Sequence, residues 1–242
     1  MTRVAVVGTG HLADATAHEC AMHFEIIDHV QAADLVWGCW DMPVNDSDES
    51  NVDWVIDQLR LTLAKVLPGT PVLISTQVPV GFCAKIEAEW PEHHFAIQPE
   101  NIRKAHAIED FHFQNRIIVG TRHEEDHELI FRVVSKFCPD PKGIMFMSPE
   151  SAEMVKHTLN AWLAMNIAFA NEIADICPTV GADVDDVFRG FRSDRRTGSH
   201  DTPNKPGGPY RGGTLGRDVH TLTTIGAGPL IRGIKTSNTA RL

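Results

Sequence analysis

The sequence predicts an α/β protein in which a reduced parallel sheet, covered by helices on both faces, is followed by a helical domain. Apolar runs of strand length alternate with helical patterns up to about residue 121, which is typical of parallel strands buried on both faces. A glycine-rich turn follows the first of these runs, and one long apolar helix begins near residue 150. We therefore expect one domain over residues 1–147 and a helical domain over residues 148–242.

Each expected element has its own signal in the sequence. Apolar runs of strand length occur at residues 3–8, 24–28, 33–40, 71–76, 94–99 and 115–121. Helical spacing occurs after the first glycine turn, over 51–67 and over about 150–180, where Gly181 is the expected end, and the segment DVDDVFRGF predicts a short further helix. Residues 198–217 are rich in glycine and proline and predict a long loop, which in a compact domain is usually functional or disordered.

Composition excludes several classes of function. Apolar residues form 43% of the chain, enough for a core, and the formal net charge is −10, which argues against a nucleic-acid surface. We find no signal peptide and no apolar run long enough to span a bilayer. The 5 cysteines are scattered, with neither a disulfide framework nor metal spacing, so we expect a cytoplasmic protein without a metal.

The turn Gly8-Thr9-Gly10, followed by His11 and Leu12, ends a strand and opens a helix. Glycines at such a turn let the backbone approach a pyrophosphate, and the helix N-terminus favours its charge, so the turn predicts a Rossmann-like dinucleotide site. A tight turn without a ligand is the alternative. Asp28 stands where a ribose ligand is expected, or is a surface carboxylate. The next strand follows it almost directly, so the adenosine half of the site looks truncated.

Two polar patterns lie outside that turn. Lys156 and Asn160 are four residues apart and share one face of the long apolar helix, where they need polar partners such as a bound hydroxyl or carbonyl. Taken alone, the two residues are better explained by a lysine at the helix rim and an asparagine bonded to backbone. The segment from His123 to His127 fits the zinc-protease spacing H-E-x-x-H, but we expect a solvated helix start there.

Four ordered segments resemble the UDP-glucose/GDP-mannose dehydrogenase family. STQVPVGF at 75–82 is similar to its S-T-x-P-P-G-T segment, and QPENIRKAHAIEDFHFQNRIIVG at 98–120 to its N-P-E-F-L-R-E-G motif and the residues after it. Residues 151–198 resemble its central helix, and KPGGPYRGGTLGRDVHTL at 205–222 its cysteine-containing loop. That family has an NAD domain, a helical dimerisation domain and a C-terminal domain that holds the nucleotide diphosphate, and the resemblance implies the first two for this shortened chain, in which we expect the third to be absent.

The resemblance also implies roles for individual residues. The implied catalytic residues are Thr76, Glu100, Lys156, Asn160 and Asp218. The implied contacts to NAD or NADP are Gly8, Gly10, His11, Leu12, Asp28, Pro43 and Thr76. The implied contacts to a small-molecule substrate are Asn101, Arg103, Arg196, Gly212, Gly213, Thr214 and Arg217. A homodimer through the helix at 150–180 is expected as well, because that helix is apolar on more faces than one small domain can cover.

Thr214 occupies the position of the family's cysteine nucleophile. A thiol supplies thiolate near neutral pH and a free hydroxyl does not, so the oxidation that passes through a thioester is not expected here. We predict an oxidoreductase limited to one two-electron step between an alcohol and a carbonyl, on a small polar or sugar-like substrate. The alternatives are an acid–base enzyme that reuses the site without a cofactor, and a non-catalytic binding protein.

Overall fold

The chain forms two compact units. A computed structural model describes residues 1–241 apart from 46–48, 100–101, 103–105, 198–205 and 212–213. The first unit comprises Met1–Pro43 and Asn51–Lys156, and the second comprises Val44–Ser50 and His157–Leu242. The boundary in the sequence between Lys156 and His157 falls inside the longest helix.

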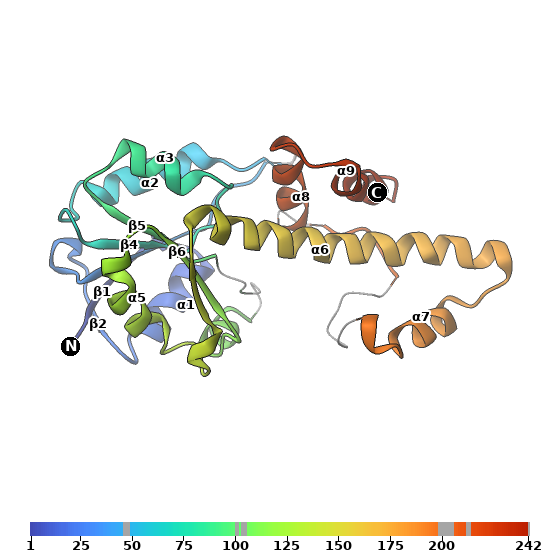
Figure 1. Cartoon of the computed structure of the whole chain (residues 1–242), viewed down its shortest axis with the longest axis horizontal. Coiled ribbons are helices and arrows are strands. Elements are labelled where there is room, and N and C mark those ends of the chain that lie inside the picture. The colour runs from blue at the N-terminus through green and yellow to red at the C-terminus, as the bar shows by residue number, and fades with distance from the viewer. Residues whose placement is uncertain (46–48, 100–101, 103–105, 198–205, 212–213, 242) are drawn as a thin grey trace. The chain divides into compact units, whose positions relative to one another are not determined.

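A seven-stranded sheet is the centre of the first unit (Figure 1). In spatial order its strands are β2 (Glu25–Ile26), β1 (Arg3–Thr9), β3 (Leu35–Trp40), β4 (Pro71–Ile74), β5 (His94–Ile97), β6 (Ile117–Thr121) and β7 (Ile144–Met147). The predicted parallel sheet is confirmed for the first five of these. β6 runs antiparallel to β5, and β7, which the sequence did not reveal, pairs parallel to β6.

Helices cover both faces of this sheet. One face packs against α2 (Val52–Leu63) and α3 (Phe82–Glu89), and the other against α1 (His11–Cys20), α4 (Ala107–His112) and α5 (His127–Val134). Successive residues of β3 point to opposite layers, Val36 to the first and Trp37 to the second, and both are fully buried. Burial on both faces explains why the strands read as continuous apolar runs.

The edge of the sheet at β2 is abbreviated, as the sequence predicted. β2 has two residues, and only the single turn η1 (Val30–Ala32) separates it from β3. The chain therefore has no room after Asp28 for a further strand and helix.

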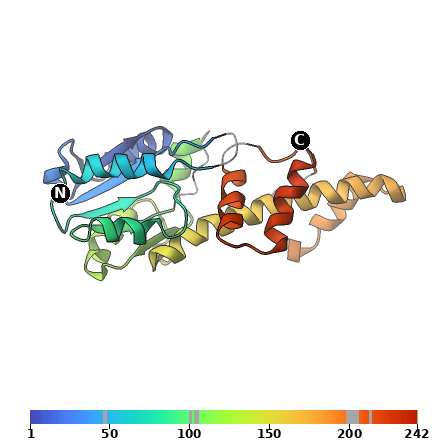
Figure 2. The ribbon, with the colours of Figure 1, turned by 90° about the horizontal axis from the view of Figure 1, so that it is seen from above.

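The second unit is helical. α6 (Pro149–Ile176) is followed by η5 (Cys177–Val180), α7 (Val184–Arg192), η6 (Arg195–Thr197), α8 (Leu215–Thr224) and α9 (Pro229–Thr239). Alanines 161, 164 and 168 let α8 and α9 lie close along α6, where Val219 and Ile234 fill the core (Figure 2). Gly181 takes the left-handed conformation expected at the end of the long helical stretch. Among the described residues, none of the helices is both long and apolar enough to cross a membrane.

The glycine- and proline-rich segment is partly tied down. Asn171 on α6 accepts a hydrogen bond from Gly207 N at 2.8 Å and donates one to Gly208 O at 3.2 Å. Asn238 on α9 accepts from Tyr210 N at 2.8 Å and donates to Tyr210 O at 3.1 Å. The predicted loop does not extend to residue 217, because α8 already begins at Leu215.

Candidate functional site

The turn between β1 and α1 is built on two glycines with positive φ. A Cβ on Gly8 would lie 1.7 Å from Cys39 O, so only glycine permits the approach of β1 to β3 at this point. Gly10 precedes α1 with φ 92° and no side-chain cap. The first turn of α1 therefore keeps backbone N–H groups available for an anion.

A pocket of about 410 Å³ opens beside this turn. Its volume falls in the range of small-molecule sites. Val7, Gly8, Thr9, Asp28, His29, Val30, Gln31, Trp40, Gln58, Leu61, Thr62 and Lys65 line it. The structure thus brings Gly8 and Asp28 together, as a nucleotide site at this turn requires, even though the sheet ends at β2. The turn with Gly8 and Gly10, together with the Asp28 carboxylate in the adjoining pocket, fits a dinucleotide.

Asp41 is the unexpected group at the turn. It directly follows β3, and its Oδ2 lies 2.8 Å from His11 Nδ1. A Cβ built on Gly10 would meet the same oxygen at 2.1 Å. A negative charge thus stands beside the N-terminus of α1, where a phosphate would approach. Its position just after an apolar strand was the only signal in the sequence that could have revealed it.

Other predicted cofactor contacts have different surroundings. His11 does not line the pocket that contains Gly8 and Asp28 but a second one, of about 570 Å³, together with residues of α1 and of the segment around α4. Leu12 is buried in the core beneath the sheet, and Pro43 is exposed and accepts a hydrogen bond from Asn51 N at 2.9 Å. Neither Leu12 nor Pro43 lines the pocket that contains Gly8 and Asp28.

Thr76 is a buried connector between strand ends. Its Oγ1 accepts a hydrogen bond from Trp40 N at 2.8 Å, which joins the segment after β4 to the end of β3. The neighbouring Ser75 accepts from Trp37 Nε1 at 2.7 Å and donates to Gln98 Oε1. These buried hydrogen bonds connect the C-terminal ends of β3, β4 and β5. Parallel sheets bind their ligands at this end of the strands.

A second group of predicted residues lies in the helical unit. Asp218 on α8 is completely buried, and its two oxygens face three side chains. Its Oδ2 accepts a hydrogen bond from Asn160 Nδ2, and its Oδ1 lies 3.2 Å from His157 Nδ1 and 3.3 Å from Arg217 Nε. We call His157, Asn160, Arg217 and Asp218 the α6–α8 polar cluster.

The charge on Asp218 is stabilised within this cluster. Burial by itself raises the pKa of a carboxyl group, but the hydrogen bond from His157, the positive charge of Arg217 and the bond from Asn160 together hold the pKa of Asp218 below its ordinary value. Asp218 is therefore a carboxylate at neutral pH. The sequence pointed to three members of the cluster and missed His157, whose only signal was its position next to Lys156.

Lys156 lies one turn before Asn160 on α6 and is 7% exposed. The spacing places both on one face of the helix, as predicted. The helix itself is anchored nearby, because Glu153 accepts hydrogen bonds from Gly81 N at 2.6 Å and Cys83 N at 2.8 Å at the start of α3. The backbone that carries Lys156 is therefore held rigidly against the sheet.

The predicted substrate contacts are only partly described. Glu100, Asn101, Arg103, Gly212 and Gly213 lie outside the described residues. Thr214 is exposed and immediately precedes α8. Arg196 is exposed and bonded to Asp194 at 2.6 Å, an ion pair within its own turn.

All five cysteines are described, and each is a buried free thiol: Cys20, Cys39, Cys83, Cys138 and Cys177. Burial raises the pKa of the Cys20 thiol, and it raises the pKa of Cys83 and Cys138 as well. A nucleophilic cysteine needs exposure and a lowered pKa. None of the five meets these requirements.

Comparisons with a family model and with individual proteins indicate the same family. The model of the UDP-glucose/GDP-mannose dehydrogenase family, central domain, matches residues 150–238. A UDP-glucose 6-dehydrogenase of Rhizobium meliloti is 30% identical over 226 residues, which is 89% of this chain and 51% of that protein. The chain thus spans about half the length of the curated relatives that it matches.

Solved structures share the fold. A UDP-D-ManNAc dehydrogenase from Pyrococcus horikoshii superimposes with a TM-score of 0.83 at 21% identity, over 99% of this chain and 69% of that one. A 3-hydroxyisobutyrate dehydrogenase from Mycobacterium tuberculosis gives 0.73 at 15% identity, over 99% of this chain and 93% of that one. At these identities the likeness concerns the fold alone.

Proposed function

The chain belongs to the UDP-glucose/GDP-mannose dehydrogenase family, and on that premise we propose that it is an NAD- or NADP-dependent oxidoreductase. Its reaction is one two-electron step between an alcohol and a carbonyl on a small polar or sugar-like substrate. The observation that carries the proposal is the pocket that joins Gly8 and Asp28 beside an uncapped helix N-terminus. A nicotinamide dinucleotide held by these residues would supply the acceptor for the hydride that leaves the alcohol carbon.

In this proposal the sheet unit, residues 1–147, binds the cofactor. Asp28 accepts hydrogen bonds from a ribose, and the N–H groups at the start of α1 meet the pyrophosphate. Thr76, fixed by Trp40, holds the strand ends that border the nicotinamide. Binding of the pyrophosphate requires Asp41 to turn away from Gly10, because two negative charges cannot share the helix N-terminus.

The helical domain, residues 148–242, supplies the polar groups for the substrate. The hydroxyl proton of the alcohol passes to water as the hydride leaves the carbon, and Lys156 holds the reacting oxygen and stabilises the negative charge that develops on it. Asn160 donates to the same oxygen or to a neighbouring hydroxyl. Asp218 is fully buried and shared among three partners, so we assign it the role of orienting Asn160 and Arg217 rather than that of a general base.

The thiols and Thr214 support the limit to one oxidation step. All five cysteines are buried, so none has the exposure of a nucleophile, and burial raises the pKa of Cys20 and Cys83. Thr214 is exposed at the start of α8, and a threonine hydroxyl stays protonated near neutral pH. Oxidation therefore stops at the carbonyl, or continues only through a hydrate that water forms without covalent attachment to the protein.

We also propose that the protein is a homodimer through α6. Trp162, Phe169 and Ile176 recur every seven residues, so they form one stripe on this helix, and they are 43%, 48% and 54% exposed. An apolar stripe of this length on an isolated helical unit is typical of an interface. Light scattering checks it: the native protein should have twice the chain mass, and Trp162→Asp should lower that mass.

One observation favours a second function. Asp41 places a carboxylate where the dinucleotide phosphates would approach, and an acid–base enzyme that reuses the fold without a cofactor would tolerate this arrangement. Calorimetric titration of the purified protein with NAD and with NADP distinguishes the two functions. Saturable binding of either dinucleotide supports the oxidoreductase, and its absence leaves the acid–base enzyme as the better account.

A further inference from the structure

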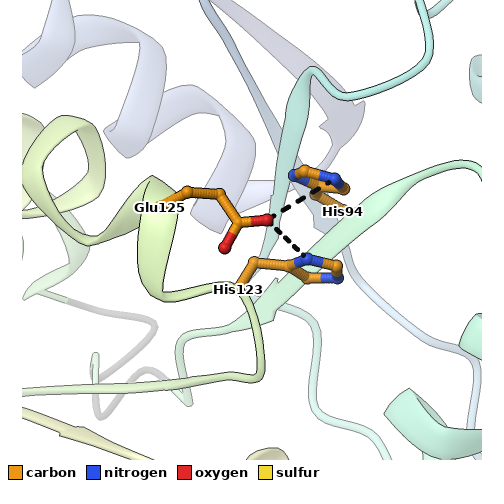
Figure 3. A group of neighbouring side chains, drawn as sticks. All are labelled: His94, His123 and Glu125. Carbon is orange, nitrogen blue, oxygen red and sulfur yellow. Dashed lines mark hydrogen bonds and ion pairs between the residues drawn. The ribbon is translucent and has the colours of Figure 1, made fainter.

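Three side chains from two separate segments of the sequence meet at one place on the sheet unit. His94 begins β5, whereas His123 and Glu125 lie in the turn that follows β6 (Figure 3). Their possible ligand atoms all lie within 4.8 Å of one another. His94 lies at the N-terminal end of β5, whereas the glycine turn follows the C-terminal end of β1. Because these parallel strands run in the same direction, the group is separate from the proposed cofactor pocket.

The two imidazoles and the carboxylate face one another. The rings of His94 and His123 are stacked, with centroids 3.9 Å apart and an interplanar angle of 11°. Glu125 Oε1 lies 3.3 Å from His123 Nδ1 and 3.9 Å from His94 Nε2 (Figure 3). Ligand atoms about 2.0–2.1 Å from a tetrahedral zinc are separated by about 3.3 Å. The first distance already matches that separation. The lone pairs of the stacked rings lie in nearly parallel planes, so binding one ion requires the His123 ring to rotate out of the stack, together with a small rotation of the exposed Glu125 side chain.

Asp126 provides an independent indication of a ligand. Its Oδ2 lies 3.0 Å from His94 Nδ1 and accepts a hydrogen bond when that nitrogen carries the proton. The lone pair of the neutral imidazole is then on Nε2, the nitrogen that faces Glu125. A carboxylate behind a histidine is the usual partner of a metal-binding imidazole, because it fixes the tautomer and the ring orientation.

The backbone also holds the second histidine in place. His123 N donates to Thr121 Oγ1 at 3.1 Å, and Thr121 Oγ1 donates to Phe95 O at 2.9 Å. The Thr121 hydroxyl therefore connects β5, which carries His94, to the turn after β6, which carries His123. His127, which the H-E-x-x-H spacing suggested as a partner of His123, stacks instead on Phe146 at 4.2 Å.

We propose that His94, His123 and Glu125 bind one zinc ion, with Asp126 orienting His94. Two imidazoles and one carboxylate form a donor set that zinc uses with three protein ligands and one water. The ion joins β5 to the turn after β6, so its effect is to stabilise the one antiparallel pairing of the sheet. The site takes no part in the proposed oxidoreductase reaction.

Zinc titration of the full chain, freed of metal with a chelator, tests this proposal. Competition with a chromogenic zinc indicator should give one tight site per chain, and zinc should raise the melting temperature. Glu125→Gln and His123→Ala should each weaken binding at least tenfold, and Asp126→Asn should weaken it roughly 10–100-fold. Glu125 is exposed, so Glu125→Gln keeps the test valid if a histidine variant fails to fold.

His18→Ala is the matched control, because the chain has 13 histidines that can bind zinc weakly. His18 is an exposed histidine on α1, outside the group, and its loss should leave the tight site unchanged. The proposal is overturned if the native chain binds no zinc tightly, or if Glu125→Gln and His123→Ala bind it as well as the His18 variant does.

Discussion

The glycine turn after β1 and the α6–α8 polar cluster are organised by different forces. At the turn, the backbone determines the geometry, since a Cβ at Gly8 would collide with Cys39 O and the pocket beside it is open. In the cluster, charge determines the geometry, since a fully buried carboxylate is held by a histidine, an asparagine and an arginine. Substitutions at the turn should therefore lower stability through backbone strain, whereas substitutions in the cluster should lower it by leaving buried charges without partners.

The largest effect is expected from Asp218→Ala. It leaves the buried Arg217 and His157 without their carboxylate, and breaking a buried ion pair costs about 3–5 kcal/mol of unfolding free energy. Urea denaturation measures it. Asp57→Asn, which touches only the exposed pair with Arg60, is the control and should cost less than about 1 kcal/mol.

The same residue gives a pH dependence. Because the folded-state pKa of Asp218 is lowered, its carboxylate contributes stability above its unfolded pKa of about 3.9, and that stability is lost as pH falls through the lower folded value. The difference in unfolding free energy between the native protein and Asp218→Asn should therefore be largest near neutral pH and shrink below about pH 4. A difference independent of pH would show that the charge of Asp218 does not matter.

Substitutions of Lys156 and of Thr214 are expected to differ in their effect on enzymatic activity. Lys156→Met keeps much of the buried side-chain volume but removes the charge beside the reacting oxygen, so kcat should fall about 10²–10³-fold. Thr214→Ala should keep activity within about twofold, as expected for an exposed position with no covalent role. Steady-state kinetics on both folded variants decide the matter. Equal loss in the two would contradict a reaction without an enzyme-bound ester.

Gly10→Val is expected to weaken dinucleotide binding and also to lower stability, because the φ of 92° at this position strains any side chain. Its Cβ would meet the flexible carboxylate of Asp41 rather than backbone, but it would block the approach of a pyrophosphate to α1. Dinucleotide affinity should fall at least tenfold, about 1.4 kcal/mol, by calorimetry. Gly8→Ala, whose Cβ would meet the backbone at Cys39 O, should lower the melting temperature more than Gly10→Val does, and a folded Gly10→Val protein with native dinucleotide affinity would refute the pyrophosphate site.

Asp41→Asn should produce the smallest change, and in the opposite direction. It removes a negative charge from the N-terminus of α1, where such charges interact with the helix by about 0.3–1 kcal/mol. Dinucleotide affinity should therefore rise a few-fold at low salt and approach the native value at high salt. Weaker binding by the variant would indicate that Asp41 contacts the cofactor favourably.

The sequence by itself determined most of the architecture. Continuous apolar strands, the glycine turn and the short gap after Asp28 predicted a parallel sheet with an abbreviated edge, because burial on both faces leaves a direct pattern in the residues. The face shared by Lys156 and Asn160 followed from helical spacing alone. Local periodicity is sufficient for such features, since each depends on residues close together in the chain.

Only the tertiary structure decided which distant side chains meet. No spacing rule joins His157 to Asp218, Asp41 to Gly10, or His94 to His123, because these contacts depend on strand order and helix packing. The reversal of β6 was also hidden, since a buried strand has the same apolar pattern in either direction. Charge pairs and ligand groups of this kind form after the chain has folded, and residues separated by tens of positions carry no local signal of them.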